Sequence, residues 1–522
     1  MTAGSSVGRR LETILCVLAA GISLSLSPEG SPLSGQVDVN QTGERPPNIV
    51  LILADDLGRG DVRAYNADSK IPTPHMNRLA TDGMQFTNAH SSASVCTPTR
   101  YGLLTGRYSW RTRLKQGVLW PPAEPLIGPD RETLATVLQG AGYRTAAVGK
   151  WHLGLDWRMQ SDDKIDFDRP IRDGPNDHGF DQSFILPGSS DMSPYVFVED
   201  GKAVAPPTRE VSDTLFGQAG PALPDLQPKD ILPRLTREAI ETIRGHARKQ
   251  ANSPLFLYFP LTAPHKPVAP ADPYRGRTTL GAYGDFVYQV DAIVGKVVRA
   301  LKEQGMFQNT LLIVTSDNGT SPNAAEDALE KGHDPNGPFR GLKATIWEGG
   351  HRIPLIATWP GHIPAGTRNH ERISLNDLMA TFAALTDQTL APSAGVDSRN
   401  ILPTLLGEPT GRPGGHAIVA RSGGGCLAIL KDTMKLANCP GSGSGWAGSP
   451  TTGEAQKRGL PPVQLYNLRR DTAETNNVQG RYPEKKRQLR QLLKQYIERG
   501  RSTPGPEQSN WKGQTRWEQL SW

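Results

Sequence analysis

The chain has 522 residues, a formal net charge of +6 at pH 7, and 37% hydrophobic and 21% charged residues. This composition excludes a disordered chain, and the length is sufficient for one large domain or two around a buried core. The mild positive excess suits an anionic substrate. No basic block with interleaved aromatic residues occurs in the sequence, which argues against nucleic-acid binding.

The N-terminal segment has the pattern of a secretory signal. Arg9 and Arg10 precede an apolar stretch over residues 14–26, which is shorter than the roughly 20 apolar residues that cross a bilayer. We therefore expect residues 1–27 to be a signal peptide and residues 28–45 to be a linker. The mature protein is expected to be exported, with no membrane association after signal removal.

The four cysteines differ in their expected fates. Cys16 would leave with the signal, and Cys426 and Cys439 flank a short stretch that could close a disulfide. Cys96 is then unpaired, in a segment SVCTPTR that reads as an exposed turn. A cationic neighbour such as Arg100 lowers the pKa of a thiol, so Cys96 is either a reactive residue or a turn cysteine without a function.

From about residue 46 to residue 400, strand-like and helix-like segments alternate. Apolar runs typical of strands buried on both faces span 46–58, 143–154, 254–267, 310–320 and 353–361. Helical spacing covers 131–139, 235–248 and 283–304. This alternation predicts an α/β catalytic domain over 46–400, with a large, mostly parallel sheet flanked by helices.

The character of the sequence changes after about residue 412. Short apolar pieces between glycine-rich loops predict a small antiparallel sheet from segments 416–422, 426–432, 434–439 and 464–468. Residues 441–460 are expected to form a surface loop, and 484–499 a charged helix whose apolar stripe packs on this subdomain. We expect the subdomain to span 401–500 and a loosely ordered tail to cover 501–522.

Polar side chains follow four of the five predicted strands. These are Asp55 with Asp56, Lys150 with His152, His265, and Asp317 with Asn318. Each has an ordinary structural reading, such as a helix cap or a turn. In an open α/β sheet, however, ligands bind just beyond the carboxyl ends of the strands, so the shared position predicts one functional site.

The oxygen ligands in this set predict a metal. The carboxylates of Asp55, Asp56 and Asp317 would raise one another's pKa, and a hard divalent cation removes that conflict. Flexible oxygen coordination, completed by Asn318, favours Ca²⁺, with Mg²⁺ second. Zinc is disfavoured because no histidine–cysteine cluster has ligand spacing.

Several cations are expected around this metal. They are Arg100, Lys150, His152, His265 and Lys343, the last in FRGLKATIWEGG. A metal surrounded by fixed cations describes a pocket for a sulfate or phosphate ester. The candidate nucleophile is Cys96.

The segment CTPTRYGLLTG resembles the sulfatase signature C-x-P-x-R-x-x-x-x-T-G. The segments ADDLG, GKWHLG, a PHKP histidine, TSDNG and GLK before EGG follow the order of the arylsulfatase A-like family of formylglycine-dependent (type I) sulfatases. The similarity runs from about residue 46 to residue 477. His351 departs from the family pattern, in which an aliphatic residue more often follows EGG.

The resemblance implies an alkaline phosphatase-like fold and conversion of Cys96 to formylglycine by a formylglycine-generating or sulfatase-maturating enzyme. It also implies that the hydrated aldehyde, bound to Ca²⁺ with the four oxygen ligands above, attacks the sulfur. By the same resemblance, Lys150 and Lys343 hold the sulfate oxygens and Arg100 orients the diol. We expect His265 to protonate the leaving alcohol and His152 to take the proton from the remaining hydroxyl.

The expected substrate is a carbohydrate sulfate rather than a small aryl sulfate, because exported proteins meet sulfated polysaccharides. The overall pattern is most similar to enzymes for galactose-type sugars, such as N-acetylgalactosamine 6-sulfate. Asp191 and Trp347 are candidate sugar contacts, although Trp347 could equally be core and Asp191 a cap. Two other functions stay open: a phosphonate or phosphodiester hydrolase, and a non-catalytic binder of sulfated glycans.

Overall fold

The computed structural model describes residues 45–162, 164–250, 252–408, 415–446, 450–511 and 513. Residues 45–522 belong to one compact unit. The expected signal peptide, and the expected linker up to residue 44, lie outside the described residues. Within the part of the chain that is described, no helix combines the length and the apolar character needed to span a membrane.

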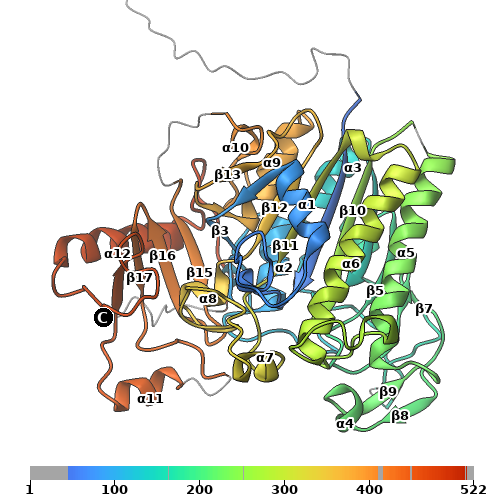
Figure 1. Ribbon diagram of the computed structural model, residues 1–522, viewed down its shortest axis with the longest axis horizontal. Coiled ribbons are helices and arrows are strands. Elements are labelled where there is room, and N and C mark those ends of the chain that lie inside the picture. The colour runs from blue at the N-terminus through green and yellow to red at the C-terminus, as the bar shows by residue number, and fades with distance from the viewer. Residues whose placement is uncertain are drawn as a thin grey trace, which may run out of the picture. The chain divides into compact units, whose positions relative to one another are not determined.

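A ten-stranded sheet forms the core of this unit (Figure 1). Its strand order is β13-β2-β12-β11-β1-β10-β4-β5-β6-β7. Five neighbouring strands at its centre are parallel, as expected: β11 (Thr310–Ser316), β1 (Asn48–Asp55), β10 (Leu255–Pro264), β4 (Arg144–Lys150) and β5 (Gln182–Leu186).

The remaining strands complete the two sides of the sheet. Antiparallel pairings add β12 (Leu355–Thr358), β2 (Met84–Phe86), β6 (Val198–Glu199) and β7 (Lys202–Ala203), while β13 (Thr367–Asn369) is parallel to β2. The fifth predicted strand is thus β12, but it runs opposite to its neighbour β11. Its carboxyl end therefore lies at the other edge of the sheet from those of the central strands.

The apolar runs become strands because both faces of the sheet are covered by helices. One group of contacting helices contains α1 (Pro74–Asp82), α5 (Pro228–Lys249) and α6 (Ala282–Glu303). A second contains α2 (Cys96–Thr105), α3 (Leu134–Gly140) and α9 (Leu378–Leu385), and the sheet lies between the groups (Figure 1). The three helices expected in this region are present as α3, α5 and α6, and α5 begins earlier than expected.

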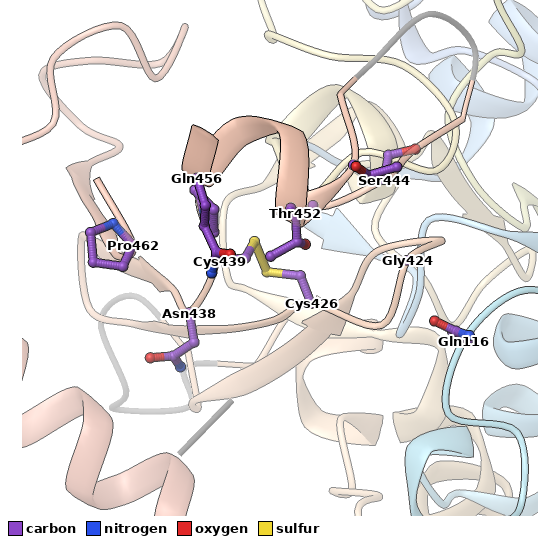
Figure 2. Close-up of a pocket in the computed structure, with 13 residues that line it drawn as sticks. Gln116, Gly424, Cys426, Asn438, Cys439, Ser444, Thr452, Gln456 and Pro462 are labelled. Carbon is purple, nitrogen blue, oxygen red and sulfur yellow. A yellow bond between two sulfur atoms is a disulfide. The ribbon is translucent and has the colours of Figure 1, made fainter. Parts of the chain in front are cut away.

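A small antiparallel sheet follows, as predicted. Its strands are β15 (Ile418–Arg421), β16 (Leu427–Lys431), β17 (Met434–Ala437) and β18 (Gln464–Asn467). Helix α12 (Pro483–Glu498) packs on β16 and β17 through one buried stripe of Leu489, Leu493, Tyr496 and Ile497. A disulfide joins Cys426 to Cys439 next to this sheet (Figure 2).

The shorter elements lie in the connections. The strands are β3 (Ala89–His90), β8 (Arg209–Val211), β9 (Gly220–Ala222) and β14 (Ile373–Ser374), and the helices are α4 (Asp213–Phe216), α7 (Glu326–Glu330), α8 (Glu348–His351), α10 (Leu402–Leu405) and α11 (Thr452–Lys457). Single 3-10 turns occur at Arg59–Asp61, Ser109–Arg111, Pro175–His178, Asp272–Tyr274, Phe307–Asn309 and Leu375–Asp377.

Two C-terminal segments differ from the sequence expectations. The expected loop 441–460 contains α11, whose first turn is capped because Thr451 accepts a hydrogen bond from the backbone N–H of Glu454. Residues 501–503 of the expected loose tail are buried, whereas most of residues 504–511 are exposed. Ser502 donates its N–H to Asp397, and Trp511 donates its N–H to the carbonyl of Arg111.

A buried charge network links the small sheet to the segment that carries α8. Lys435 on β17 places its ammonium 3.1 Å from Glu348, 2.9 Å from Glu474 and 2.9 Å from Nε2 of His351. The other ring nitrogen of His351 lies 3.0 Å from Nδ1 of His90. The histidine that departs from the family pattern is therefore part of the contact between the two sheets.

Candidate active site

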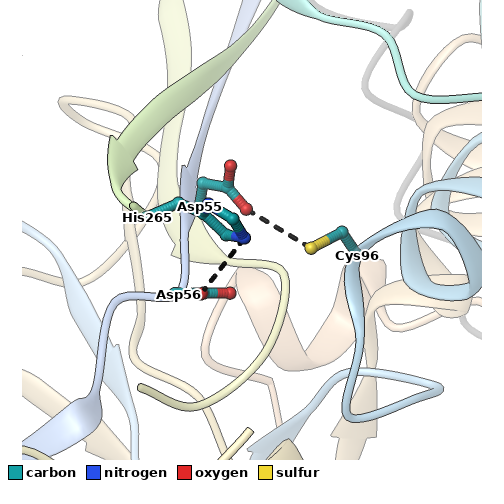
Figure 3. A group of neighbouring side chains, drawn as sticks. All are labelled: Asp55, Asp56, Cys96 and His265. Atoms are coloured by element: carbon teal, nitrogen blue, oxygen red, sulfur yellow. Dashed lines mark hydrogen bonds and ion pairs between the residues drawn. The ribbon is translucent and has the colours of Figure 1, made fainter. Parts of the chain in front are cut away.

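The carboxyl ends of β11, β1, β10 and β4 meet at one edge of the large sheet and bring the predicted polar residues together. The N–H of Asp56 donates to Asp317 over 3.1 Å, which joins the ends of β1 and β11. The ammonium of Lys150 donates to Asp55 over 2.7 Å, and Nε2 of His265 lies 3.7 Å from Asp56 (Figure 3). The shared edge thus creates one cluster from four distant segments.

Cys96 reaches this cluster from α2, of which it is the first residue. It is 2% exposed, so the expected exposed turn is wrong: the residue begins a helix packed under the sheet edge. Its thiol donates to Asp55 over 3.5 Å (Figure 3). Arg100 lies one helical turn further on and donates to Asp317 over 2.7 Å and to the carbonyl of Lys150 over 3.0 Å.

Burial and neighbouring charges shift the pKa values of the groups in the cluster. Burial raises the pKa of Asp55, but the positive charges of Lys150 and its cationic neighbours hold it well below its usual value. The pKa of Asp317 rises to about 6 because of burial and the adjacent carboxylate of Asp55, against the effect of Arg100. Burial also raises the pKa of the Cys96 thiol to about 12. The unmodified thiol of Cys96 is therefore expected to be protonated at neutral pH.

Three residues of the site have left-handed backbone conformations. The φ angles are 67° at Asp56, 57° at His152 and 71° at Ala344, none of which is a glycine. Such conformations cost on the order of 1–3 kcal/mol each and persist only where the surrounding structure enforces them. Next to Asn318, position 319 requires a glycine, because a Cβ there would collide with the carbonyl oxygen of Gly349. The local geometry is therefore specified by close packing around the site.

The donor set fits a hard cation. The side-chain oxygen of Asn318 is buried without a hydrogen-bond partner, while its amide nitrogen donates to Asp56 over 2.7 Å. An acceptor left without a donor among carboxylates marks a position for a cation. Ligand atoms of Asp55, Asp56, Cys96 and His265 lie within 4.8 Å of one another. With Asp317 and Asn318, the site offers four oxygen-bearing side chains, and oxygen is the ligand atom that Ca²⁺ takes.

The hydrogen bonds of His152 and His265 determine which ring nitrogen of each residue is free to face the site. His152 must donate from Nε2 to the carbonyl of Leu119 over 2.9 Å, and its Nδ1 is buried without a partner. Burial and the charges of Lys150 and Arg100 lower the pKa of His152 well below its usual value. His265 donates from Nδ1 to the carbonyl of Lys266 over 2.7 Å, so its Nε2 is the nitrogen next to Asp56.

A cavity of about 290 Å³ opens above the cluster. Cys96, His152, His265 and Lys343 line its inner end, where the ammonium of Lys343 lies 2.8 Å from Asp56. Asp191 also lines it and is 5% exposed, with one carboxylate oxygen that accepts no hydrogen bond. The cavity thus combines a polyionic inner end with a free acceptor on its wall.

Trp347 is not among the residues that line this cavity. Its indole N–H donates to Gln464 over 3.2 Å, and the guanidinium of Arg340 lies 3.7 Å from the ring centroid. The side chain is partly buried against the small sheet. The structure therefore brings Asp191, but not Trp347, to the predicted site.

Sequence reasoning missed three residues of the site. Ser189 accepts a hydrogen bond from Lys150 over 3.1 Å and follows the parallel strand β5. This strand is too short to be recognised in the sequence as an apolar run. Reading this strand to its carboxyl end, as for the others, would have found it. Trp120, which is 56% exposed, and Trp446 line the outer cavity and come from loops with no sequence signal.

Comparisons with known proteins agree with this geometry. The family model described as Sulfatase matches residues 47–388. The chain is 35% identical over 503 residues to an N-acetylgalactosamine-6-O-sulfatase of Bacteroides thetaiotaomicron, covering 88% of this chain and 94% of that protein. It is 36% identical over 374 residues to the human N-acetylgalactosamine-6-sulfatase, covering 69% and 66% of the two chains.

A solved structure gives the same match in three dimensions. It is a sulfatase from Bacteroides thetaiotaomicron, described within the metabolism of multiple glycosaminoglycans. It superposes with a TM-score of 0.76 at 33% identity, and covers 86% of this chain and 99% of the other.

Proposed function

The chain belongs to the sulfatase family and is a sulfuric ester hydrolase, and on this premise we propose that it releases sulfate from a galactose-type sugar such as N-acetylgalactosamine 6-sulfate. The observation that carries this proposal is the buried convergence of Cys96, three carboxylates and fixed cations at the inner end of a cavity walled by Asp191. Two relatives with sequence matches are named for that sugar sulfate. We also propose export, with the catalytic part over residues 46–400 and the small subdomain over 401–500.

The proposal includes two groups that complete the site. Residue 96 would be formylglycine, made from Cys96 by a maturating enzyme, and Ca²⁺ would be held by residue 96 with Asp55, Asp56, Asp317 and Asn318. When both are present they supply an oxygen nucleophile and offset the negative charge of the sulfate. The unpartnered oxygen of Asn318 supports this ligand set.

The cations of the chain then bind and orient the sulfate. Lys343 and Lys150 offer ammonium groups on two sides of residue 96, the first within 3.4 Å of its sulfur. Arg100 is held by Asp317 and the carbonyl of Lys150, and fixes residue 96 relative to the sheet edge. Such preformed charges stabilise the charge that develops on the transferred group.

Two histidines would move protons in the reaction. His265 would protonate the leaving sugar oxygen from Nε2 in its doubly protonated form, since Nδ1–H already donates to the carbonyl of Lys266. His152 would take a proton from residue 96 at Nδ1, which carries the lone pair when Nε2 donates to Leu119. The Nε2–H tautomer of His152 is therefore suited to accepting a proton at Nδ1.

The test is sulfate release by protein produced together with a maturating enzyme. The substrates are galactose-type and glucosamine-type 6-sulfates, a simple aryl sulfate, and a phosphonate ester, compared by kcat/KM in one buffer. We expect the galactose-type sulfate to be preferred. A faster phosphonate ester would favour the alternative hydrolase activity, and an aryl sulfate turned over without any sugar sulfate would contradict the carbohydrate assignment.

A further inference from the structure

A second cavity, of about 630 Å³, lies beside the disulfide of the small sheet and is larger than the active-site cavity (Figure 2). Its polar side chains are neutral amides and hydroxyls: Gln116, Asn438, Ser444, Thr451, Thr452 and Gln456. Two prolines and the disulfide provide its apolar surface. None of the described residues that line it carries a charge.

Asn438 is an independent sign that this cavity takes a polar ligand. The residue is 1% exposed, and neither atom of its amide has a hydrogen-bond partner within the protein. Buried polar groups are almost always paired, so these atoms require water or a ligand. An amide offers two donors and one acceptor, which matches hydroxyl groups that both donate and accept.

The second cavity and the active-site cavity share two wall segments, at residues 116–118 and 444–446. Gln116 lines the second cavity, and Val118, two residues later, lines the active-site cavity. In the same way, Ser444 lines the second cavity and Trp446 lines the active-site cavity.

Backbone hydrogen bonds join the segments that line the two cavities. Gly117 donates to Gly423 over 2.7 Å, and Gly423 donates to Ala344 over 2.8 Å. Ala344 lines the active-site cavity, and Gly424, next to Gly423, lines the second. A short series of hydrogen-bonded residues thus connects the linings of the two cavities.

We propose that the second cavity binds a neutral hexose unit of an oligosaccharide whose sulfated unit occupies the active site. This inference rests on the proposed function. Amides and hydroxyls suit sugar hydroxyls, and the proline and disulfide surfaces suit the apolar face of a pyranose ring. Without a lining cation, the cavity selects a neutral unit over a uronate or a second sulfated sugar. We call it the neutral subsite.

The first test compares two substrates on one pair of variants. Gln116 and Gln456 are exposed, so the double variant Gln116→Ala/Gln456→Ala keeps the fold, and Gln488→Ala on the outer face of α12 is the matched control. We expect about a tenfold loss of kcat/KM for a 6-sulfated galactose-type unit linked to a neutral hexose. The corresponding monosaccharide sulfate should change less than twofold. Equal losses on both substrates, or no loss, would overturn the proposal.

A second test does not depend on catalysis. An unsulfated galactose-type tetrasaccharide is titrated calorimetrically into the wild type, the double variant and Asn438→Ala. Binding to the wild type that weakens at least tenfold in both variants supports the neutral subsite, and absence of binding overturns it. Tighter binding of a uronate-containing tetrasaccharide would overturn the choice of a neutral unit. Failure of the proposed function appears separately, as absence of sulfate release from every sugar sulfate.

Discussion

Lys343 places its ammonium 3.4 Å from the sulfur of Cys96, although the two residues are 247 positions apart in the chain. The same ammonium donates to Asp56 over 2.8 Å. A fixed positive charge thus lies close to both the Asp56 carboxylate and residue 96. This arrangement favours an anionic ester at residue 96 over a neutral one.

Replacement of Cys96 tests the proposed modification. Cys96→Ala removes the precursor of the nucleophile and little buried volume, so turnover should be lost while the thermal transition stays nearly unchanged. Peptide mass analysis of active wild type should show the thiol converted to an aldehyde. Full activity in protein that carries only unmodified cysteine would contradict the proposal.

Metal binding is tested by Asp317→Asn and by chelation. The amide keeps the shape of the side chain but removes one negative charge, so calcium content and activity should both fall. Chelation should lower the thermal transition of the wild type, because a ligand that binds only the native state stabilises it. Asp272→Asn, an exposed aspartate paired with Lys229, is the control and should retain its calcium. Unchanged calcium content in Asp317→Asn would exclude this ligand.

His265→Ala tests whether His265 protonates the leaving group. General acid catalysis contributes about 10²–10⁴-fold, and a sugar alkoxide needs it whereas an activated phenolate does not. We therefore expect a loss in that range for a sugar sulfate and a much smaller loss for a nitrophenyl sulfate. Losses of equal size would mean that His265 only binds the sulfate group.

Asp191→Ala should affect sugar recognition. One carboxylate oxygen of Asp191 accepts no hydrogen bond within the protein, so a sugar hydroxyl would satisfy it, and hydrogen bonds to charged groups are worth about 1.5–3 kcal/mol. We expect KM for the sugar sulfate to rise roughly 10- to 150-fold on this basis. The KM for an aryl sulfate, which has no hydroxyl to offer, should change little. A parallel rise in both KM values would make Asp191 a structural partner of Lys266.

Lys435→Met should destabilise the protein without touching the active site. The change leaves Glu348 and Glu474 buried near each other without their shared cation. Removing one partner of a buried ion pair costs about 3–5 kcal/mol, measurable by urea unfolding. Lys494→Met, at an exposed pair with Glu498, should change stability by less than about 1 kcal/mol. A loss as small as that of the control would show that water reaches the network.

The sequence predicts the inner part of the site better than the outer part. Asp55, His265 and Asp317 could be placed because parallel strands bring their carboxyl ends to one edge, a rule that needs no side-chain detail. The reversed direction of β12 and the burial of Cys96 depend on packing between distant segments. So does the position of Trp347, which Arg340 and Gln464 hold away from the cavity.

The outer wall of the active-site cavity comes from loops. Trp120 and Trp446 both line this cavity and come from loops far apart in the chain, so no local sequence pattern predicts that they share it. Sequence therefore predicts the chemistry at the sulfate more readily than the sugar that carries it.

The division of the cavity between two sheets has an evolutionary consequence. Asp55 and Lys150, next to residue 96, lie on strands of the large sheet, whereas Trp446 and most of the neutral subsite belong to loops around the disulfide-bonded small sheet. Substitutions in those loops can accumulate without displacing a metal ligand. Related proteins can thus come to act on different glycans while they keep the same reaction.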